Sequence, residues 1–426
     1  MRRTQFLLVA VGLVLMTAAP AAAAPTSSDP TTAAKAAAVW LAHQVNPQGF
    51  IPSAADPATP NLSGSAQAVI AMAAAGLGRN QVDAVLGYLA KHVDDFVVRQ
   101  GSDDAGALSY LILAVQAGSQ DPASFGPSHA NLLNRLQATK QPTGLFGAQD
   151  PTFDGAFRQG LALMALHGAG LSDATATTWL IGQQCANGSW TAFRSNTTTP
   201  CPAVDPSTFT GPDTNSTALA MLGLHAQGRT TEPANGATRL AAVRNATGGW
   251  GFLARADQPT DANSTGVVVT ALRAVTGSRD ARGAAAILAL QVGCGGDPAD
   301  QGGIAFQPGA SGALAPDVLA TDQATPALAN VVLPQASPTI ASSLPDVCAA
   351  SPSTSSTSTT TTTVVSKGSN AEGGPEVLAV STTAAQLPST GSSSIALIGV
   401  ALLLIGVGSC VLSAAASLRV RLARRG

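Results

Sequence analysis

Charged residues are scarce in this sequence. Only 11% of its 426 residues are Asp, Glu, Lys or Arg, whereas an average soluble protein carries about 25%. The formal net charge is −2, and a surface for nucleic acid needs a clear excess of Lys and Arg. The composition therefore excludes nucleic acid as the main partner.

Aromatic residues are also scarce, at 4% of the chain, whereas glycine and proline are abundant, with 43 and 27 residues. So many helix breakers exclude long uninterrupted helices, but they allow short helices that are joined by turns. The length suffices for one large domain or two ordinary ones.

The first 24 residues are typical of a secretory signal. Arg2 and Arg3 supply the positive start, Phe6–Met16 the apolar run, and an alanine-rich stretch leads to a cleavage site near Ala22–Ala24. The apolar run is shorter than the ~20 residues that a membrane-spanning helix needs. We therefore expect residues 1–24 to be removed on export, and a membrane anchor at this end is the alternative.

The C-terminus carries a second processing pattern, in which an apolar run and an arginine-rich tail follow the motif Leu387-Pro388-Ser389-Thr390-Gly391. This order resembles the cell-wall sorting signal of Gram-positive surface proteins. The resemblance implies that sortase cleaves after Thr390 and joins it to peptidoglycan. The run 395–412 would meanwhile span the membrane as a helix that the cytoplasmic arginines hold in place. A permanent tail anchor is the alternative.

The segment before this signal, 349–386, is rich in Ser and Thr. Its apolar content is too low to offset the entropy of ordering, so we expect an extended wall spacer. The globular part is then 30–348, and residues 387–426 form the sorting signal. The expected location is the Gram-positive cell wall, with membrane association before sorting.

Four of the five cysteines lie in the exported part, and export favours disulfides over metal ligation. Four cysteines allow three pairings. We favour a local pair, Cys185–Cys201, around a Gly-, Asn-, Thr- and Pro-rich loop, which leaves Cys294–Cys348. No histidine lies near them in the sequence, so we expect no metal site and no cofactor.

A turn that ends in an aromatic residue recurs along the globular part. Its copies are Gln48-Gly49-Phe50, Gly144-Leu145-Phe146, Gly188-Ser189-Trp190, Gly248-Gly249-Trp250 and Gly303-Ile304-Ala305-Phe306, with Phe96 as a degenerate member. An apolar helical segment that often closes with Gln precedes each turn. A second, almost wholly apolar helix follows it, as in 160–166, 217–224 and 265–275. Helices that are apolar all round are buried, so we expect an all-α fold of six repeats with an inner and an outer ring.

The run Gln184-Cys185-Ala186-Asn187-Gly188-Ser189-Trp190 is similar to the repeat of squalene–hopene cyclases. The region 30–340 as a whole resembles the α/α toroid that terpenoid cyclases share with protein prenyltransferase β-subunits and cobalamin carriers. The resemblance implies this fold, whereas it leaves the activity open.

A second marker, an Asp at the start of the inner helices, recurs at Asp104, Asp154, Asp213, Asp261 and Asp322. The copies beginning at Asp213 and Asp261 align with the acidic motif of the cyclases, in which a central Asp protonates the substrate. Here Asn215 and Asn263 occupy that position, and an amide cannot act as the acid. Helix capping explains the Asp set. Since inner helices of a toroid begin at one end, the caps can also form a polar mouth together with Asn215, Ser216, Asn263, Ser264 and Thr325.

We therefore expect a non-catalytic ligand-binding or surface-interaction module whose candidate residues are Asp154, Asp213, Asn215, Ser216, Asp261, Asn263, Ser264 and Asp322. Its partners would be sortase, peptidoglycan and an unknown small-molecule or surface ligand. An enzyme that acts on an isoprenoid, similar to terpenoid cyclases or prenyltransferases, is the first alternative. A purely structural surface protein is the second. A polysaccharide lyase is disfavoured, since the chain has only two tyrosines, Tyr88 and Tyr110, to serve as bases.

Overall fold

The computed structural model describes residues 27–147, 155–335 and 338–348. The predicted secretory signal, wall spacer and sorting signal, with its helix at 395–412, lie outside these residues. Within them the chain is mostly helical, as expected. None of the described helices has both the length and the apolar character needed to cross a membrane.

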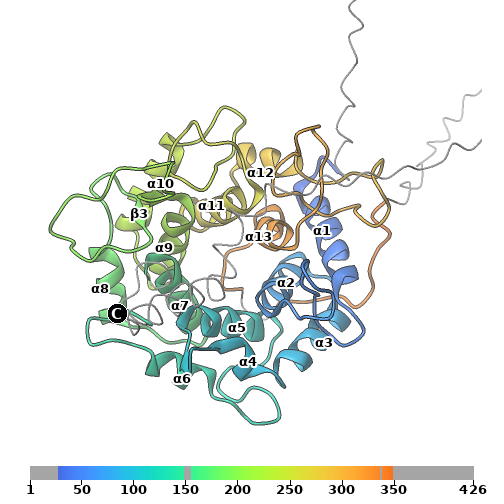
Figure 1. The fold of residues 1–426 in the computed structure, drawn as a ribbon, viewed down its shortest axis with the longest axis horizontal. Helices are drawn as coiled ribbons and strands as arrows, with labels where there is room; N and C mark the ends of the chain where they lie inside the picture. The colour runs from blue at the N-terminus through green and yellow to red at the C-terminus, as the bar shows by residue number, and fades with distance from the viewer. Residues whose placement is uncertain (1–26, 148–154, 336–337, 349–426) are drawn as a thin grey trace, which may run out of the picture. The chain divides into compact units, whose positions relative to one another are not determined.

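Two sets of helices alternate along the described part of the chain (Figure 1). The inner set is almost wholly buried and comprises α2 (Leu62–Ala75), α5 (Ala105–Ala117), α7 (Ala156–Gly168), α9 (Thr214–Ala226), α11 (Ala262–Thr276) and α13 (Val318–Ala329). The outer set comprises α1 (Pro30–Gln44), α3 (Arg79–Leu89), α6 (Leu132–Ala138), α8 (Ala174–Gly182), α10 (Thr231–Ala242) and α12 (Ala281–Leu288). The helices expected at 160–166, 217–224 and 265–275 are confirmed as parts of α7, α9 and α11.

The inner helices form a closed ring. Each packs on the next in chain order, and α13 packs back on α2 (Figure 1). Each outer helix packs against one or two inner helices. The core therefore lies between the two layers and between neighbouring inner helices, where side chains such as Ala, Leu and Val are fully buried.

The Gly turns join neighbouring outer helices. Gly188 has φ +87°, and a Cβ there would lie 2.4 Å from the carbonyl oxygen of Asn235 in α10. The amide of Gln184 donates to the carbonyls of Gly188 and Glu232, both at 3.0 Å. The turn thus requires glycine, and the Gln before it ties the turn to the next outer helix.

A turn contact of the same kind joins the last part of the ring to α1. A Cβ on Gly302, at φ +89°, would lie 2.4 Å from the carbonyl oxygen of Ala36 in α1. Gln291 Nε2 donates to the carbonyls of Ala33 and Gly302, both at 2.9 Å. Residues more than 250 positions apart therefore make the same contact that joins neighbouring outer helices elsewhere in the ring.

The two turn tryptophans are buried and hydrogen-bonded. Trp190 donates its main-chain N–H to the hydroxyl of Thr217 in α9 at 3.0 Å and its indole N–H to the carbonyl of Leu180 at 2.9 Å. Trp250 makes the same pair of bonds, to Thr265 and Leu240. These residues therefore fasten each turn between an inner and an outer helix.

The predicted register is wrong in the first and last turns. The main-chain N–H groups of Ile51 and Ile304 make the bonds that Trp190 makes, to the hydroxyls of Ser65 and Thr321. Ile51 and Ile304, rather than Phe50 and Phe306, thus occupy the Trp position. Phe96 lies in no such turn, because it belongs to a short helix, α4 (Val93–Val97), which precedes the hairpin β1 (Val98–Arg99) and β2 (Ser102–Asp103).

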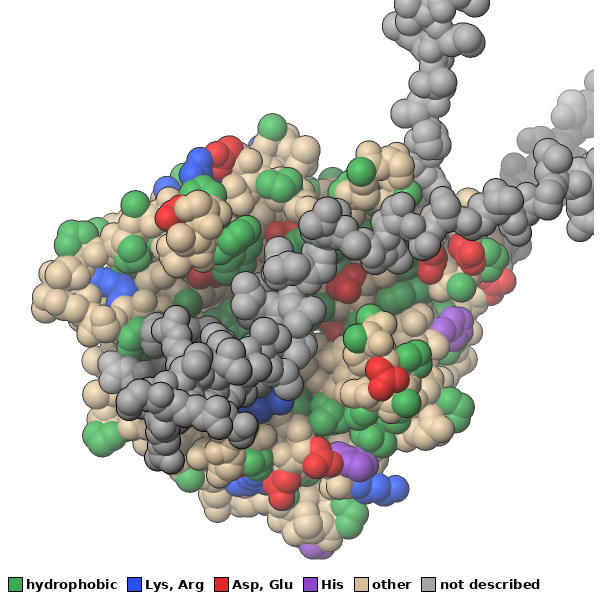
Figure 2. Space-filling view, viewed as in Figure 1, with side chains coloured by type: hydrophobic (Ala, Val, Ile, Leu, Met, Phe, Trp, Pro, Cys, Tyr) green, Lys and Arg blue, Asp and Glu red, His purple; other side chains and the backbone are tan. Residues whose placement is uncertain are grey.

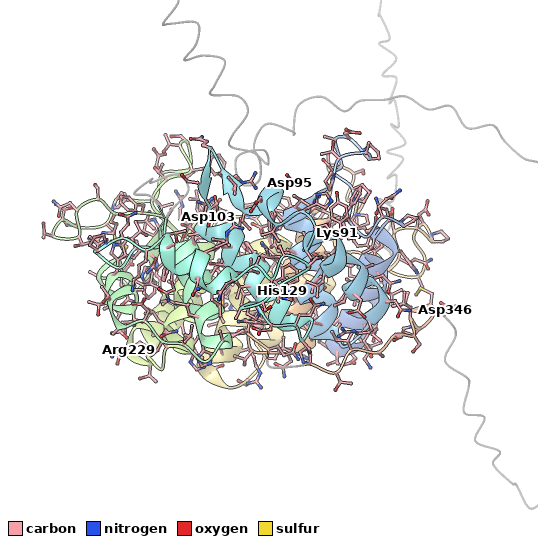
Figure 3. All side chains as sticks on the ribbon, turned by 90° about the horizontal axis from the view of Figure 1, so that it is seen from below. Lys91, Asp95, Asp103, His129, Arg229 and Asp346 are labelled. Carbon is pink, nitrogen blue, oxygen red and sulfur yellow. A yellow bond between two sulfur atoms is a disulfide. The ribbon has the colours of Figure 1, made fainter. Side chains whose placement is uncertain are left out.

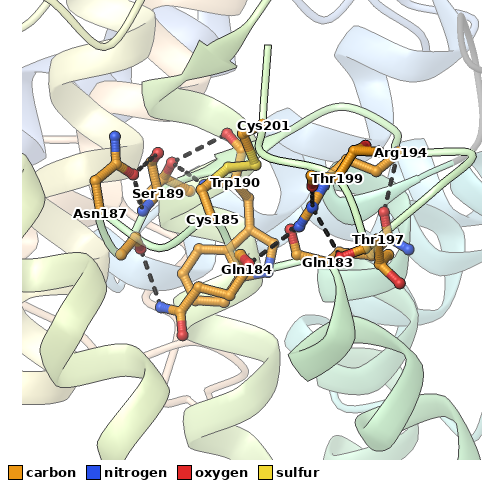
Figure 4. The surroundings of a disulfide bond; sticks show 12 residues. Gln183, Gln184, Cys185, Asn187, Ser189, Trp190, Arg194, Thr197, Thr199 and Cys201 are labelled. Atoms are coloured by element: carbon orange, nitrogen blue, oxygen red, sulfur yellow. Dashed lines mark hydrogen bonds between the residues drawn. A yellow bond between two sulfur atoms is a disulfide. The ribbon is translucent and has the colours of Figure 1, made fainter. Parts of the chain in front are cut away.

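Both predicted disulfides are confirmed, Cys185–Cys201 and Cys294–Cys348. The first links Cys185, in the turn before strand β3 (Trp190–Thr191), to Cys201 in the loop that joins β3 to its antiparallel partner β4 (Pro212–Asp213). Arg194 braces this loop from within, since its guanidinium donates to the carbonyls of Gln184 and Thr199 at 3.1 and 2.6 Å (Figure 4).

Candidate functional site at the N-terminal end of the inner ring

The inner helices begin at one end of the ring. The first N–H of α7, α9 and α11 donates to a loop of the following unit: Ala156 to the carbonyl of Ala192 (2.7 Å), Thr214 to that of Phe252 (2.8 Å), and Ala262 to that of Phe306 (3.0 Å). In side view, Asp103, just before α5, and Arg229, just after α9, lie at opposite ends (Figure 3). Groups on the first turns therefore gather at one end.

Capping by the predicted Asp residues is confirmed for three helices. Asp104 accepts from the N–H of Ala107 at 2.7 Å, Asp213 from that of Ser216 at 2.6 Å, and Asp261 from that of Ser264 at 2.6 Å. Asp154 lies outside the described residues. A carboxylate cap satisfies N–H groups that have no partner inside the helix.

Two predicted members of this set do not lie where the pattern put them. The cap of α13 is Asp317, which accepts from the N–H of Ala320 at 2.8 Å, so Asp322 lies inside the helix. Thr325 is one turn farther in and donates to the carbonyl of Thr321. The helix begins five residues earlier than the pattern indicates. Thr321, four residues after Asp317, supplies the hydroxyl that accepts the main-chain N–H of Ile304 in the turn.

Asp213 and Asp261 are unusual caps because they are buried. Desolvation raises the pKa of each carboxyl to about 7, although the hydrogen bonds from Ser216 and Ser264 oppose the shift. Near neutral pH each group is therefore balanced between its acid and its carboxylate, and a nearby charge can shift this balance.

The four predicted amide and hydroxyl residues lie at the same helix starts and are all buried: Asn215, Ser216, Asn263 and Ser264. The hydroxyl of Ser264 donates to Asp261 at 3.0 Å, so it serves the cap. Asn263 is 8% exposed, and its Oδ1 has no hydrogen-bond partner within the described residues. Asn215, at the matching position of α9, lies 3.4 Å from the Thr214 hydroxyl, a weak contact.

A second polar cluster lies one turn farther along the inner helices, and the sequence pattern did not single it out. The amide of Gln323 in α13 donates to Gln67 in α2 at 3.1 Å. The Tyr110 hydroxyl in α5 lies near Gln323 and Asp322; burial raises its pKa, and the charge of Asp322 adds to the rise. Three inner helices thus contribute to one cluster, Gln67, Tyr110, Asp322 and Gln323, which we call the inner polar cluster.

Asp322 is the least satisfied member of this cluster. It is 3% exposed, and neither carboxylate oxygen has a hydrogen-bond partner in the described part of the chain. Burial, reinforced by the nearby Asp317, raises the pKa of Asp322 well above its ordinary value. A spacing of six from the helix caps to Gln67, Tyr110 and Gln323 is the signal that would have revealed the cluster.

Acidic groups lie at this end of the ring, where Asp104, Asp213, Asp261 and Asp317 cap inner helices. Figure 2 views the ring as in Figure 1 and shows acidic side chains near the middle of this face. Arg158 in α7 pairs with Asp104 at 3.4 Å. The described residues hold no group of three or more His, Cys, Asp or Glu side chains that could bind a metal ion.

A separate surface cavity of about 250 Å³ lies beside α4 and is lined by residues that include Lys91, Ser128 and Arg135. It contains a His92–Asp95 pair at 2.8 Å, and Tyr88 stacks on His92. Arg135 bonds to Asp94 and Asp103. The charged groups of this cavity are thus largely paired with one another.

The sequence matches no protein-family profile and no curated protein, but its fold has relatives among solved structures. Unsaturated glucuronyl hydrolase from Bacillus sp. GL1 is 12% identical, with a TM-score of 0.51 over 70% of this chain and 95% of that one. The described part of this protein therefore has an α/α toroid fold.

Two cyclases match less closely. The type II terpene cyclase MstE from Scytonema is 13% identical, with a TM-score of 0.48 over 71% of this chain and 97% of that one. ent-Copalyl diphosphate synthase from Streptomyces platensis is 19% identical, with a TM-score of 0.42 over 63% of this chain. The match spans 50% of that synthase. At 12% identity the glucuronyl hydrolase shows the fold alone, so function must be argued from the site.

Proposed function

We propose that this protein is a secreted, wall-anchored α/α toroid of six repeats that binds a small ligand, without catalysis, at the N-terminal end of its inner ring. One observation carries the proposal. Buried polar groups gather at that end, and the oxygens of Asn263 and Asp322 there have no partner within the described residues. Folded proteins rarely leave such groups unpaired, since each costs free energy.

The proposed location depends on the ends of the chain. Residues 1–24 would direct export, 349–386 would cross the wall, and the LPSTG motif at 387–391 would be joined to peptidoglycan by sortase. The helix at 395–412 would hold the chain in the membrane until then. Two disulfides in the toroid are consistent with an extracellular protein.

A cyclase-like enzyme that acts on an isoprenoid is the second candidate, and Asp322 is the observation in its favour. Burial raises the pKa of this carboxyl well above its ordinary value, so it keeps its proton to higher pH than an exposed Asp does, as a general acid must. Against it, Asn215 and Asn263 hold the positions of the acidic motif. Carbocations also need aromatic walls, whereas Trp190 and Trp250 are buried in the turns.

Mass spectrometry of small molecules extracted from the purified, disulfide-intact protein tests the proposal. We expect one compound at near-stoichiometric amounts from the unmodified protein. Asp213→Asn with Asp261→Asn should lose most of it, since Asn keeps the caps but removes the acids. The exposed Asp257→Asn is the matched control and should retain it. Absence of any bound compound supports a purely structural protein, and turnover of an added isoprenoid supports the enzyme.

A further inference from the structure

Asp322 occupies a position at which the other inner helices carry a small residue. The fifth residue after the one that precedes each of these helices (Asn61, Asp104, Gly155, Asp213 and Asp261) is small and buried: Ala66 in α2, Ser109 in α5, Gly160 in α7, Ala218 in α9 and Gly266 in α11. In α13 the residue five positions after Asp317 is Asp322. A carboxyl therefore stands where the fold otherwise has at most a hydroxymethyl group.

The close approach of neighbouring helices explains the small residues. A Cβ on Gly160 would lie 2.1 Å from the carbonyl oxygen of Leu219 in α9, and one on Gly266 would lie 2.4 Å from that of Gln323 in α13. This position thus faces the next inner helix of the ring. For α13 the next helix is α2, so Asp322 lies at the contact between the last and first inner helices, beside the Gln323–Gln67 bond.

The unpartnered atoms of the inner polar cluster are acceptors. They are the two carboxylate oxygens of Asp322. At this end the inner helices contribute Asp213, Asp261 and Asp317, whereas Asp104 is paired with Arg158, whose charge also acts on Tyr110 of the cluster. What would satisfy them is a group that brings several hydrogen-bond donors and a positive charge.

We propose that the inner polar cluster recognises a primary ammonium group, with Asp322 as its counter-ion. An ammonium carries three N–H donors and no acceptor, which matches a set of unpaired oxygens. A metal ion is a poorer match, because the described residues provide no cluster of three metal-ligating side chains. This inference rests on the proposed ligand-binding function and names the chemical class of the ligand.

The test is a ligand-observed NMR titration of the full-length protein in a mild detergent, with butylamine, charged at neutral pH, as the probe. The neutral 1-butanol is its control. We expect saturable binding of butylamine and at least tenfold weaker binding of 1-butanol. Asp322→Ala, which gives α13 the residue that α2 and α9 have, should weaken butylamine binding at least tenfold. The exposed Asp257→Asn, with the same change of charge, should leave it unchanged.

Equal binding of butylamine and 1-butanol, equal binding by the unmodified protein and Asp322→Ala, or no binding of butylamine at all overturns the inference. If Asp322→Ala does not fold, the isosteric Asp322→Asn makes the same comparison. The two proposals fail separately. A compound that is extracted with the protein, and lost from the Asp213/Asp261 variant, would keep the binding function even if butylamine does not bind.

Discussion

Two residues of this toroid both cap a helix and carry a buried carboxyl with a raised pKa. Asp213 caps α9 and Asp261 caps α11, yet both are buried and desolvated. The hydrogen bonds of the cap hold the carboxyl where water does not reach it. The fold thereby has acids at the ring mouth that change charge within the physiological range.

This arrangement makes stability fall as pH rises. An unfolded Asp titrates near about 4, whereas burial raises the pKa of Asp213 and Asp261 to about 7. Between these values the folded state holds protons that the unfolded state has released, so the stabilisation is complete below about pH 4 and is lost as pH rises through about 7. We expect the urea midpoint to be higher at pH 5 than at pH 8. Asp213→Asn with Asp261→Asn should reduce this difference, and an unchanged difference would contradict the assignment.

Asp322 leads to a second prediction about stability. Replacing it with Ala removes a buried carboxyl without hydrogen-bond partners in the described residues, so the free energy of unfolding should rise by ~1–3 kcal/mol. Chemical denaturation measured at pH 8, where the cost of burial is greatest, checks this. Asp257→Asn should change little, since that side chain is exposed. A destabilised Asp322→Ala protein would mean that the carboxyl has a structural partner.

At the scale of elements, the turn glycines are the most constrained positions. Gly188→Ala forces an alanine to φ +87° with its Cβ 2.4 Å from a carbonyl oxygen. The free energy of unfolding should fall by roughly 2–5 kcal/mol. Gly87→Ala is the matched control, since that glycine lies within α3 with nothing near its Cβ. It should stabilise by ~0.5–1 kcal/mol, and denaturant midpoints of the two variants compare them directly.

The local disulfide gives another element-scale prediction. Cys185–Cys201 closes a loop with a sequence separation of 16. Changing both cysteines to Ala should lower the free energy of unfolding by ~3 kcal/mol, because the unfolded chain regains its loop entropy. Equilibrium denaturation measures the loss. A loss close to zero would mean that Arg194, which bonds to carbonyls on both sides of the loop, already holds it.

How far the sequence could lead depended on how local each signal is. The apolar helices and the Trp turns were predictable, since each depends on a few neighbouring residues. The disulfides were predictable because Cys185 and Cys201 flank one loop, which leaves only Cys294 and Cys348 to pair. The pattern marks Asp322 rather than Asp317 as the cap, because the two are close together and the side-chain pattern alone does not show where the helix begins. The inner polar cluster was missed, since Gln67, Tyr110 and Gln323 come together only when the ring closes.

At the scale of the whole molecule, wall attachment is the main prediction. Digesting intact cells with a muramidase should release the protein in heterogeneous, sugar-bearing sizes. Thr390→Ala should prevent this, because it removes the residue that would be joined to peptidoglycan. Immunoblots of wall, membrane and medium fractions distinguish the outcomes. Uniform release of the unmodified protein by detergent alone would show that the motif is accidental.

The position of the second disulfide has a mechanical consequence. Cys348 is bonded to Cys294, so the segment between them, which includes α13, lies inside a covalent loop. In a chain tethered at its C-terminal side, tension enters the toroid at Cys348. It passes through the disulfide to Cys294, which follows α12 in the chain. The covalent path of the tension therefore bypasses α13, the helix that carries Asp317 and Asp322.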